Sequence, residues 1–188
     1  MRQYGEGDQG HGAADRSSVE NNIISYLDAH ARDYPEKTAL QWVPVQRMQT
    51  WNGADPLAHA SITYRELVSR IARAGQGLKD LGIEKGDRVM IFVPMTVELY
   101  VAMFAVQRIG AAAVFLDSWA RKDQLGVCAR VVNPKAMISL EPAFELCEGV
   151  AGLADIPVRV VTGPHRQSYS ARLEDLSAAA SESALEPV

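Results

Sequence analysis

The chain has 188 residues, of which 19 are Lys or Arg and 23 are Asp or Glu, and its formal net charge is −4. This balance argues against nucleic acid or an anionic membrane as the main partner, because both attract a basic surface. The length suffices for one domain with a hydrophobic core. No apolar run approaches membrane-spanning length, and the first residues lack the apolar centre of a secretion signal. We therefore expect a cytoplasmic protein without a transmembrane segment.

Cys128 and Cys147 are the two cysteines of the chain. Their spacing matches no metal site or redox pair, and both lie in apolar helical patterns, which predicts buried, reduced thiols. The four histidines lie far apart and lack metal-binding spacing as well. The sequence therefore predicts no metal site.

The first 16 residues are glycine-rich and polar, and we interpret residues 1–16 as a disordered tail. This tail contains Gly5-Glu6-Gly7-Asp8-Gln9-Gly10, which matches the letters of a dinucleotide-binding fingerprint. The fingerprint functions between a strand and a helix, and the sequence around it predicts neither element directly beside it. We interpret the match as chance.

A capping box formed by Ser17 and Glu20 is predicted to open the first helix, and Pro35 to close it. The apolar stripe of this helix comprises Ile23, Ile24, Leu27, Ala31 and Tyr34. Thr38 to Val43 is predicted to be a strand. The polar stretch 46–60 carries turn signals and is either a hairpin, whose return strand includes Met48 to Trp51, or a loop.

The stretch from Ile62 to Asp117 is predicted to organise the chain. Thr63 and Glu66 can form a second capping box, and Ile62 and Leu67 flank it as a hydrophobic staple would. The apolar residues that recur on one face of the following helix are Leu67, Ile71, Ala74, Leu78 and Leu81. Gly82 comes next, where glycine most easily adopts the left-handed conformation that ends a helix.

Two continuous apolar runs, Val89 to Val93 and Ala112 to Leu116, predict strands buried on both faces. Between them, the stretch from Thr96 to Ile109 leaves little polar surface, which predicts a helix inside a larger body. Thr96 is its candidate N-cap, and Gly110 is predicted to end it. We expect parallel pairing of these strands with a third at 136–139.

The alternation of helices and strands continues to the end of the chain. Asp117 or Ser118 is predicted to cap a helix, and the residues on its inner face are Leu125, Cys128, Val131 and Val132. Further predicted elements are a strand at 136–139, a helix with Pro142 in its first turn, a strand at 158–162 and a helix at 173–180. This order predicts an α/β fold with a mostly parallel sheet flanked by helices and a small N-terminal β element.

Ligands of parallel sheets bind beyond the carboxyl ends of the strands. The segments at these ends are Pro94 to Thr96, Asp117 to Trp119, Leu140 with Glu141, and Thr162 to His165. Thr96 and Ser118 are interpreted as helix caps, and Asp117 is another cap candidate that has no visible partner as a catalytic acid. Trp119 could line a pocket, lie at an interface or simply pack. The chain contains no nucleophile elbow and no lysine-bearing phosphate loop. We therefore assign no catalytic residue and no metal ligand, and the cofactor-binding residues stay unknown.

Several segments, in their order and spacing, resemble the adenylate-forming ligase superfamily, which comprises acyl- and aryl-CoA synthetases, nonribosomal adenylation domains and luciferases. The segments are Asn22 to Leu27, Pro35 to Ala39, Ile62 to Leu67, Gly82 to Val89, Pro94 to Glu98 and Ala105 to Asp117. The resemblance covers nearly everything from about Val19 to Leu140. Met95 and Ser118 depart from it, since the family usually has a small polar residue and a proline there.

The resemblance implies a parent enzyme that uses ATP, Mg²⁺ and coenzyme A to join a carboxylic acid to a thiol through an acyl-adenylate. The family's phosphate loop and catalytic lysine have no counterpart in this sequence. Residues 17–180 would then form the N-terminal subdomain and 181–188 a linker toward a missing remainder. We expect this part alone to be inactive and to hold no cofactor tightly, with the helix start at Thr96 as its only generic anion site. Its partners would be the rest of the ligase chain and, as a further role, a second copy in a homodimer.

A fatty or other apolar acid is the default substrate under this interpretation. The alternatives are a non-catalytic nucleotide-sensing module and a scaffold or interaction domain, both of which explain the missing chemistry.

Overall fold

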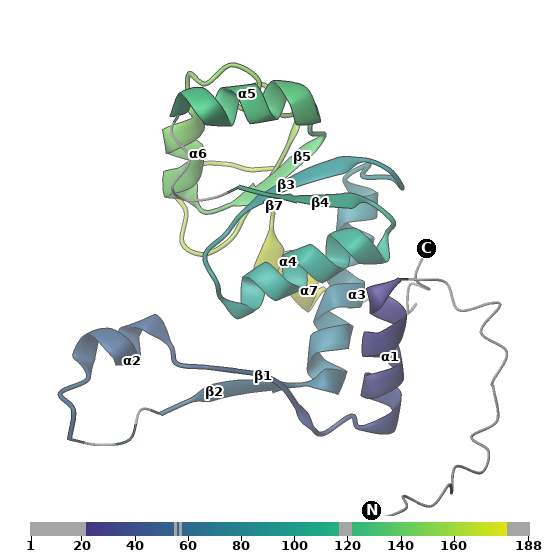
Figure 1. The fold of residues 1–188 in the computed structure, drawn as a ribbon, viewed down its shortest axis with the longest axis vertical. Coiled ribbons are helices and arrows are strands. Elements are labelled where there is room, and N and C mark those ends of the chain that lie inside the picture. The colour runs from purple at the N-terminus through teal and green to yellow at the C-terminus, as the bar shows by residue number, and fades with distance from the viewer. Residues whose placement is uncertain (1–21, 55, 57, 117–121, 180–188) are drawn as a thin grey trace, which may run out of the picture.

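The computed structural model describes residues 22–54, 56, 58–116 and 122–179 (Figure 1). The predicted tail with its glycine motif, the box of Ser17 and Glu20, the cap at Asp117 or Ser118, Trp119 and the linker 181–188 lie outside the described residues. Within the described part, no helix is both long and apolar enough to span a membrane.

The chain starts with a helix and a β-hairpin. Helix α1 (Ile23–Asp33) is capped by Asn22, whose side chain accepts a hydrogen bond from the Ile24 amide at 3.0 Å. Ile24 is buried, but Ile23 and Tyr34 of the predicted apolar stripe are more than half exposed. The apolar stripe of the described helix is therefore narrower than predicted.

The hairpin joins β1 (Thr38–Trp42) to β2 (Ala60–Thr63) in antiparallel pairing. The predicted return strand at Met48 to Trp51 is wrong, because α2 (Val45–Thr50) occupies most of that stretch. The β-branched pair Ile62 and Thr63 makes the better return strand, since it buries Ile62 against the core.

Helix α3 (Tyr64–Asp80) starts directly after the hairpin with the predicted capping box. The Glu66 amide donates to Thr63 Oγ1 at 3.2 Å, and the Thr63 amide donates to the Glu66 carboxylate at 2.9 Å. The predicted inner face is confirmed at Leu67, Ile71, Ala74 and Leu78, all buried. Gly82 follows with a φ of +85°, as a left-handed helix end requires.

A five-stranded parallel sheet follows, with the strand order β4-β3-β5-β6-β7. Its strands are β3 (Arg88–Phe92), β4 (Ala112–Phe115), β5 (Ala136–Ser139), β6 (Val158–Val161) and β7 (Ala171–Arg172). The predicted parallel pairing of β3 with β4 and β5 is confirmed. The predicted burial of β4 on both faces is wrong: it is an edge strand with Ala112 and Phe115 exposed.

Helices cover both faces of the sheet (Figure 1). Alternate strand residues point to opposite sides, so Val89 and Ile91 join the core beneath α3 and α4 (Val97–Arg108), whereas Met90 joins the core beneath α5 (Lys122–Val132) and α6 (Glu141–Cys147). The short α7 (Leu173–Ala178) packs on α3. Helix α4 is largely buried, as predicted.

The inner face of α5 is rotated from the predicted one. Leu125, Gly126 and Ala129 are buried, whereas Cys128 is exposed and Val131 is 81% exposed. Successive helix residues turn by about 100°, so Cys128 and Val131 lie away from a face centred between Leu125 and Gly126. Burial is thus confirmed for Cys147 and wrong for Cys128, and neither cysteine forms a disulfide within the described part of the chain.

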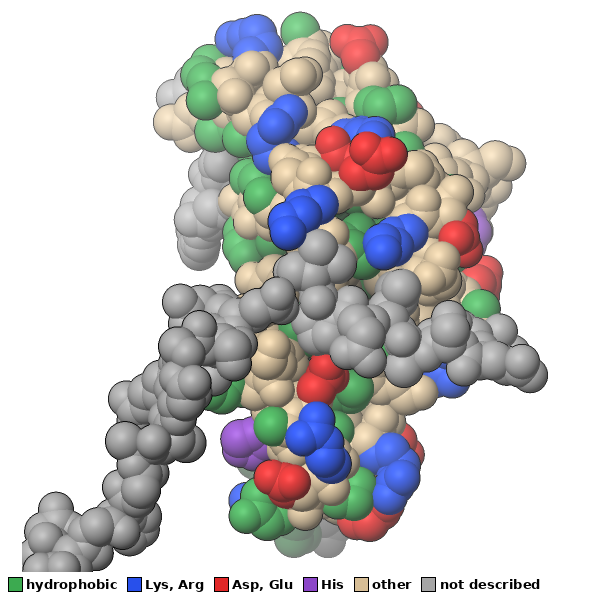
Figure 2. All heavy atoms as spheres, turned by 90° about the vertical axis from the view of Figure 1, so that its right-hand side faces the viewer, with side chains coloured by type: hydrophobic (Ala, Val, Ile, Leu, Met, Phe, Trp, Pro, Cys, Tyr) green, Lys and Arg blue, Asp and Glu red, His purple; other side chains and the backbone are tan. Residues whose placement is uncertain are grey.

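The face of the molecule in Figure 2 shows acidic and basic side chains interspersed rather than segregated. A uniformly basic surface of the kind that binds nucleic acid is not visible among the described residues on that face.

Replacing Thr63 by alanine should lower the free energy of unfolding by about 1 kcal/mol, because the α3 N-terminus loses its capping oxygen. Thr96 is the matched control: it occupies the N-cap of α4 but makes no side-chain capping bond. Thr96→Ala should cost clearly less in urea unfolding followed by circular dichroism. Equal losses for the two variants would contradict the role assigned to the α3 cap.

Candidate functional site

A hollow of about 470 Å³ opens where the central parallel strands end. Its lining residues come from the ends of β3 and β4, the segment after each of β3, β4 and β5, and the starts of α4 and α6: Ile91, Phe92, Val93, Pro94, Met95, Leu99, Phe115, Leu116, Leu140 and Ala143. We call it the strand-end hollow. Its volume lies in the range of small-molecule sites. Two of the predicted strand-end segments, Pro94 to Thr96 and Leu140 with Glu141, contribute residues to it.

The side chains that line the strand-end hollow are all apolar, so the hollow suits a hydrocarbon group rather than a phosphate. Met95 is 82% exposed and Phe115 is 51% exposed, although both are large apolar residues. Apolar side chains gathered at an open hollow mark a ligand site or a surface covered by other protein. Sequence reasoning assigned Phe115 to a buried strand, because an apolar run does not tell an edge strand from a central one.

Ser139 fixes the base of this region. It is fully buried at the end of β5, and its hydroxyl donates to the Phe92 carbonyl oxygen of β3 at 2.6 Å. The bond ties together the ends of two strands beside the hollow. The only sequence signal was a polar residue ending a short apolar run, which is too common to single out.

Glu141 connects two further strand-end segments. Its carboxylate accepts hydrogen bonds from the amides of Arg166 and Gln167, each at 2.8 Å, and lies 3.4 Å from the Tyr169 hydroxyl. The amides of Gln167 and Arg166 hold the pKa of Glu141 below its ordinary value. Burial, and then the charge of Glu141, raise the pKa of Tyr169. Glu141 thereby anchors the loop that follows β6.

The remaining polar groups at the strand ends also serve the backbone. Glu174 Oε1 accepts bonds from the Thr162 hydroxyl at 2.9 Å and from the Gly163 amide at 2.7 Å. His165 is exposed and packs its ring edge-on against Tyr169. Across the described ranges, no group of three or more His, Cys, Asp or Glu side chains could hold a metal ion.

Comparison with known proteins identifies a family for most of the chain. Residues 27–185 match the family described as AMP-binding enzyme. The acetyl-coenzyme A synthetase of Psychrobacter cryohalolentis is 30% identical over 139 residues, which are 74% of this chain and 19% of that protein. The acetyl-coenzyme A synthetase of Nostoc linckia is 48% identical over 93 residues, which are 50% of this chain and 25% of that protein.

Solved structures share the fold. The anthranilate CoA ligase AuaEII, crystallised with anthranoyl-AMP, superposes with a TM-score of 0.70 and 20% identity over 88% of this chain and 30% of its own. Identity at that level supports the fold alone. The chain spans about a fifth to a quarter of the curated relatives described above.

The anchor at Glu141 predicts a pH dependence. Because its pKa is lower in the folded chain than its ordinary value of 4.5, its contribution to stability is present above pH 4.5 and is lost as the pH falls through the folded pKa. The melting temperature of the wild type should therefore exceed that of Glu141→Gln at neutral pH, and the difference should shrink in acid.

Glu145, exposed on the same helix, supplies the control. Glu145→Gln should leave the pH profile of the melting temperature close to that of the wild type. A difference between wild type and Glu141→Gln that stays constant from pH 7 to acid would count against the charged anchor.

Proposed function

Because the chain belongs to the AMP-binding enzyme family, we propose that it is the N-terminal part of an ATP-dependent carboxylate–CoA ligase. The family match over residues 27–185 carries this proposal. The share of the relatives that the chain covers supports it further, since a fifth of a ligase would hold only part of the machinery. The proposed partner is the remainder of the ligase chain.

In the proposed reaction, a carboxylate oxygen attacks the α-phosphorus of ATP, an O–P bond forms, and pyrophosphate leaves. The thiol sulfur of coenzyme A then attacks the acyl carbon, and AMP leaves. The first step needs hydrogen-bond donors and cations aimed at the phosphate charge, which Mg²⁺ helps to neutralise. The apolar lining of the strand-end hollow does not fit Mg²⁺ or a phosphate, so we assign both to other parts of the ligase.

We assign the strand-end hollow to the apolar part of a substrate, either the acyl group or the thiol-bearing arm of coenzyme A. Leu99, Met95 and Phe115 would form its wall. The exposure of Met95 and Phe115 fits a face that another part of the ligase covers. The relatives named as acetyl-coenzyme A synthetases make acetate the first acid to test, ahead of the fatty acid expected by default.

A non-catalytic nucleotide-sensing or scaffold module is the second candidate. It is favoured by the hydrogen bonds of Glu141 and Glu174, since both carboxylates at the strand ends are bound to backbone amides rather than free for acid–base chemistry. The ligase and the non-catalytic module can be distinguished by one observation: only the ligase assignment predicts that a longer chain catalyses the reaction.

The 188-residue chain should not catalyse carboxylate-dependent exchange of labelled pyrophosphate into ATP, with acetate or with a fatty acid. A longer chain that carries the downstream family motifs should gain the exchange, because donors must be preorganised around the phosphate rather than merely nearby. Exchange by the 188-residue chain alone would overturn the assignment, and a longer chain that folds but stays inactive would favour the sensing or scaffold module.

A further inference from the structure

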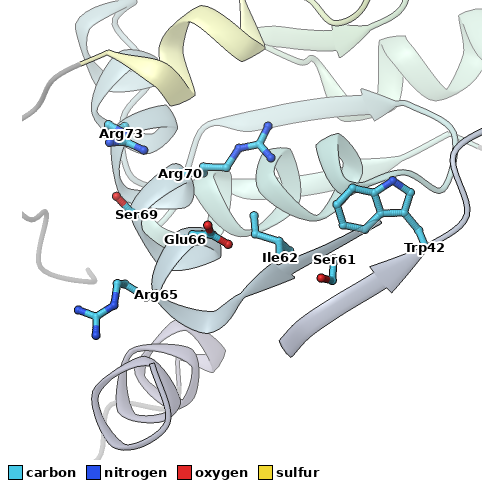
Figure 3. Close-up of a pocket in the computed structure, with 8 residues that line it drawn as sticks. All are labelled: Trp42, Ser61, Ile62, Arg65, Glu66, Ser69, Arg70 and Arg73. Atoms are coloured by element: carbon cyan, nitrogen blue, oxygen red, sulfur yellow. The ribbon is translucent and has the colours of Figure 1, made fainter. Parts of the chain in front are cut away.

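A second hollow, of about 430 Å³, lies between the β1–β2 hairpin and α3 (Figure 3). Its lining residues are Trp42, Ser61, Ile62, Arg65, Glu66, Ser69, Arg70 and Arg73. We call it the α3 groove. It shares no lining residue with the strand-end hollow, and it differs in composition, since six of its eight lining residues are charged or carry a hydroxyl group.

The arginines of the α3 groove differ in how closely a carboxylate of the chain pairs with each guanidinium charge. Arg65 is engaged outside the groove, where it contacts the Glu36 carboxylate through two of its nitrogens at 2.9 Å. Arg70 approaches the Glu98 carboxylate only to 3.9 Å, which is too long for a hydrogen bond. Figure 3 shows Arg65 directed away from Trp42, whereas Arg70 extends toward the Trp42 side of the groove.

Arg73 retains donors as well. Its Nε donates to the Ser177 carbonyl oxygen at 2.7 Å, which fixes the side chain and leaves the two terminal nitrogens without a partner among the described residues. Arg70 and Arg73 are both partly buried residues, and the charge of a partly buried side chain is screened less than that of a fully exposed one.

The acidic group in the lining does not cancel these charges. The Glu66 carboxylate lies in the α3 capping box, where Oε2 accepts from the Thr63 amide at 2.9 Å and from the Thr63 hydroxyl at 3.1 Å. The hydroxyl groups of Ser61 and Ser69 line the same groove and have no partner within the described part of the chain. Guanidinium and hydroxyl groups that are not used up within the described part of the chain therefore belong to the lining of a space of ligand size.

Trp42 contributes an aromatic surface to the groove. Trp42 is partly buried and stands on the hairpin side of the groove, and Arg70 is the arginine that extends toward it, whereas Arg65 and Arg73 lie farther from it (Figure 3). An exposed indole face offers a stacking surface for a planar ring. Guanidinium forks bind the oxygens of phosphates bidentately, and a phosphate has three terminal oxygens to meet two guanidinium groups and two hydroxyls.

We propose that the α3 groove binds a small phosphorylated ligand with a planar ring, of the nucleoside monophosphate class, with Arg70 and Arg73 on the phosphate and Trp42 against the ring. The site is separate from the strand-end hollow and does not depend on the ligase assignment. The anion site predicted at the start of α4 rested on a helix terminus alone; the α3 groove adds side chains that can hold the anion.

The test titrates the 188-residue chain with AMP, adenosine and inorganic phosphate, and follows the indole N–H signal of Trp42 by NMR. AMP should shift this signal saturably, and more tightly than adenosine or phosphate alone. Arg70→Gln should weaken AMP binding by about tenfold, the effect of losing one charge-assisted contact. Glu98→Gln should strengthen it, because the carboxylate nearest to Arg70 is removed.

Arg65→Gln is the matched control: Arg65 also lines the groove, but two of its nitrogens contact Glu36, so this variant should lose clearly less AMP affinity than Arg70→Gln. Trp42→Leu, followed by calorimetry, should bring AMP affinity down toward that of inorganic phosphate. Circular dichroism establishes that each variant is folded. The proposal is overturned if AMP fails to saturate, if Arg70→Gln binds like the wild type, or if Arg65→Gln loses as much affinity as Arg70→Gln.

The same experiments distinguish two other occupants of the groove, an unphosphorylated ring and another part of the protein. Binding of adenosine as tight as that of AMP would show a ring site without a phosphate requirement and would contradict the proposal. A longer ligase chain that folds but no longer binds AMP at Trp42 would show that other protein fills the groove, which also contradicts it. Neither result bears on pyrophosphate exchange, so the ligase assignment stands or falls separately.

Discussion

Burial of the central strands on both faces is the constraint on which the rest of the structure depends. In β3, β5 and β6, successive residues alternate between the core under α3 and α4 and the core under α5 and α6. Such a sheet is stable only while both helical layers are present. Parallel strands held in this way end at one edge, and the hydrogen bond from Ser139 to Phe92 locks two of those ends together. The strand-end hollow is a consequence of that arrangement.

The sequence predicted secondary structure most accurately where a residue type has a single well-defined structural role. The box of Thr63 and Glu66, the glycine at 82 and the continuous apolar run of β3 predicted their elements to within a residue or so. Tertiary context decided the rest. Whether β4 lies at an edge depends on the order of the strands, and β7, with its two residues, is too short to leave a pattern.

The sequence predicted the location of the candidate site at the carboxyl ends of the strands, but not all of the side chains that line it. Pro94 and Leu140 were expected at strand ends, and both line the hollow. Met95 was expected only as part of the strand-end segment Pro94 to Thr96, and Phe115 was missed, because an apolar side chain has the same sequence signature in a core and on an open wall. The α3 groove was missed for a related reason: Trp42 and Arg70 lie in different elements, and only the hairpin brings them together.

The strand-end hollow and the α3 groove differ in the chemistry of their lining residues. One is apolar and lies at the carboxyl ends of the parallel strands, and the other is lined by arginine side chains and the Trp42 indole. The strand-end hollow offers no polar side chain, and the donors of the α3 groove line a separate space, so we assign the adenylation chemistry to other parts of the ligase.

The codons that follow Val188 in the parent gene test this assignment most directly. A ligase parent predicts an open reading frame that soon encodes a loop rich in Ser, Thr and Gly and ending in Pro-Lys, as in the adenylate-forming ligases that the chain resembles. A stop codon directly after Val188 would contradict the assignment of this chain to the N-terminal part of a longer ligase.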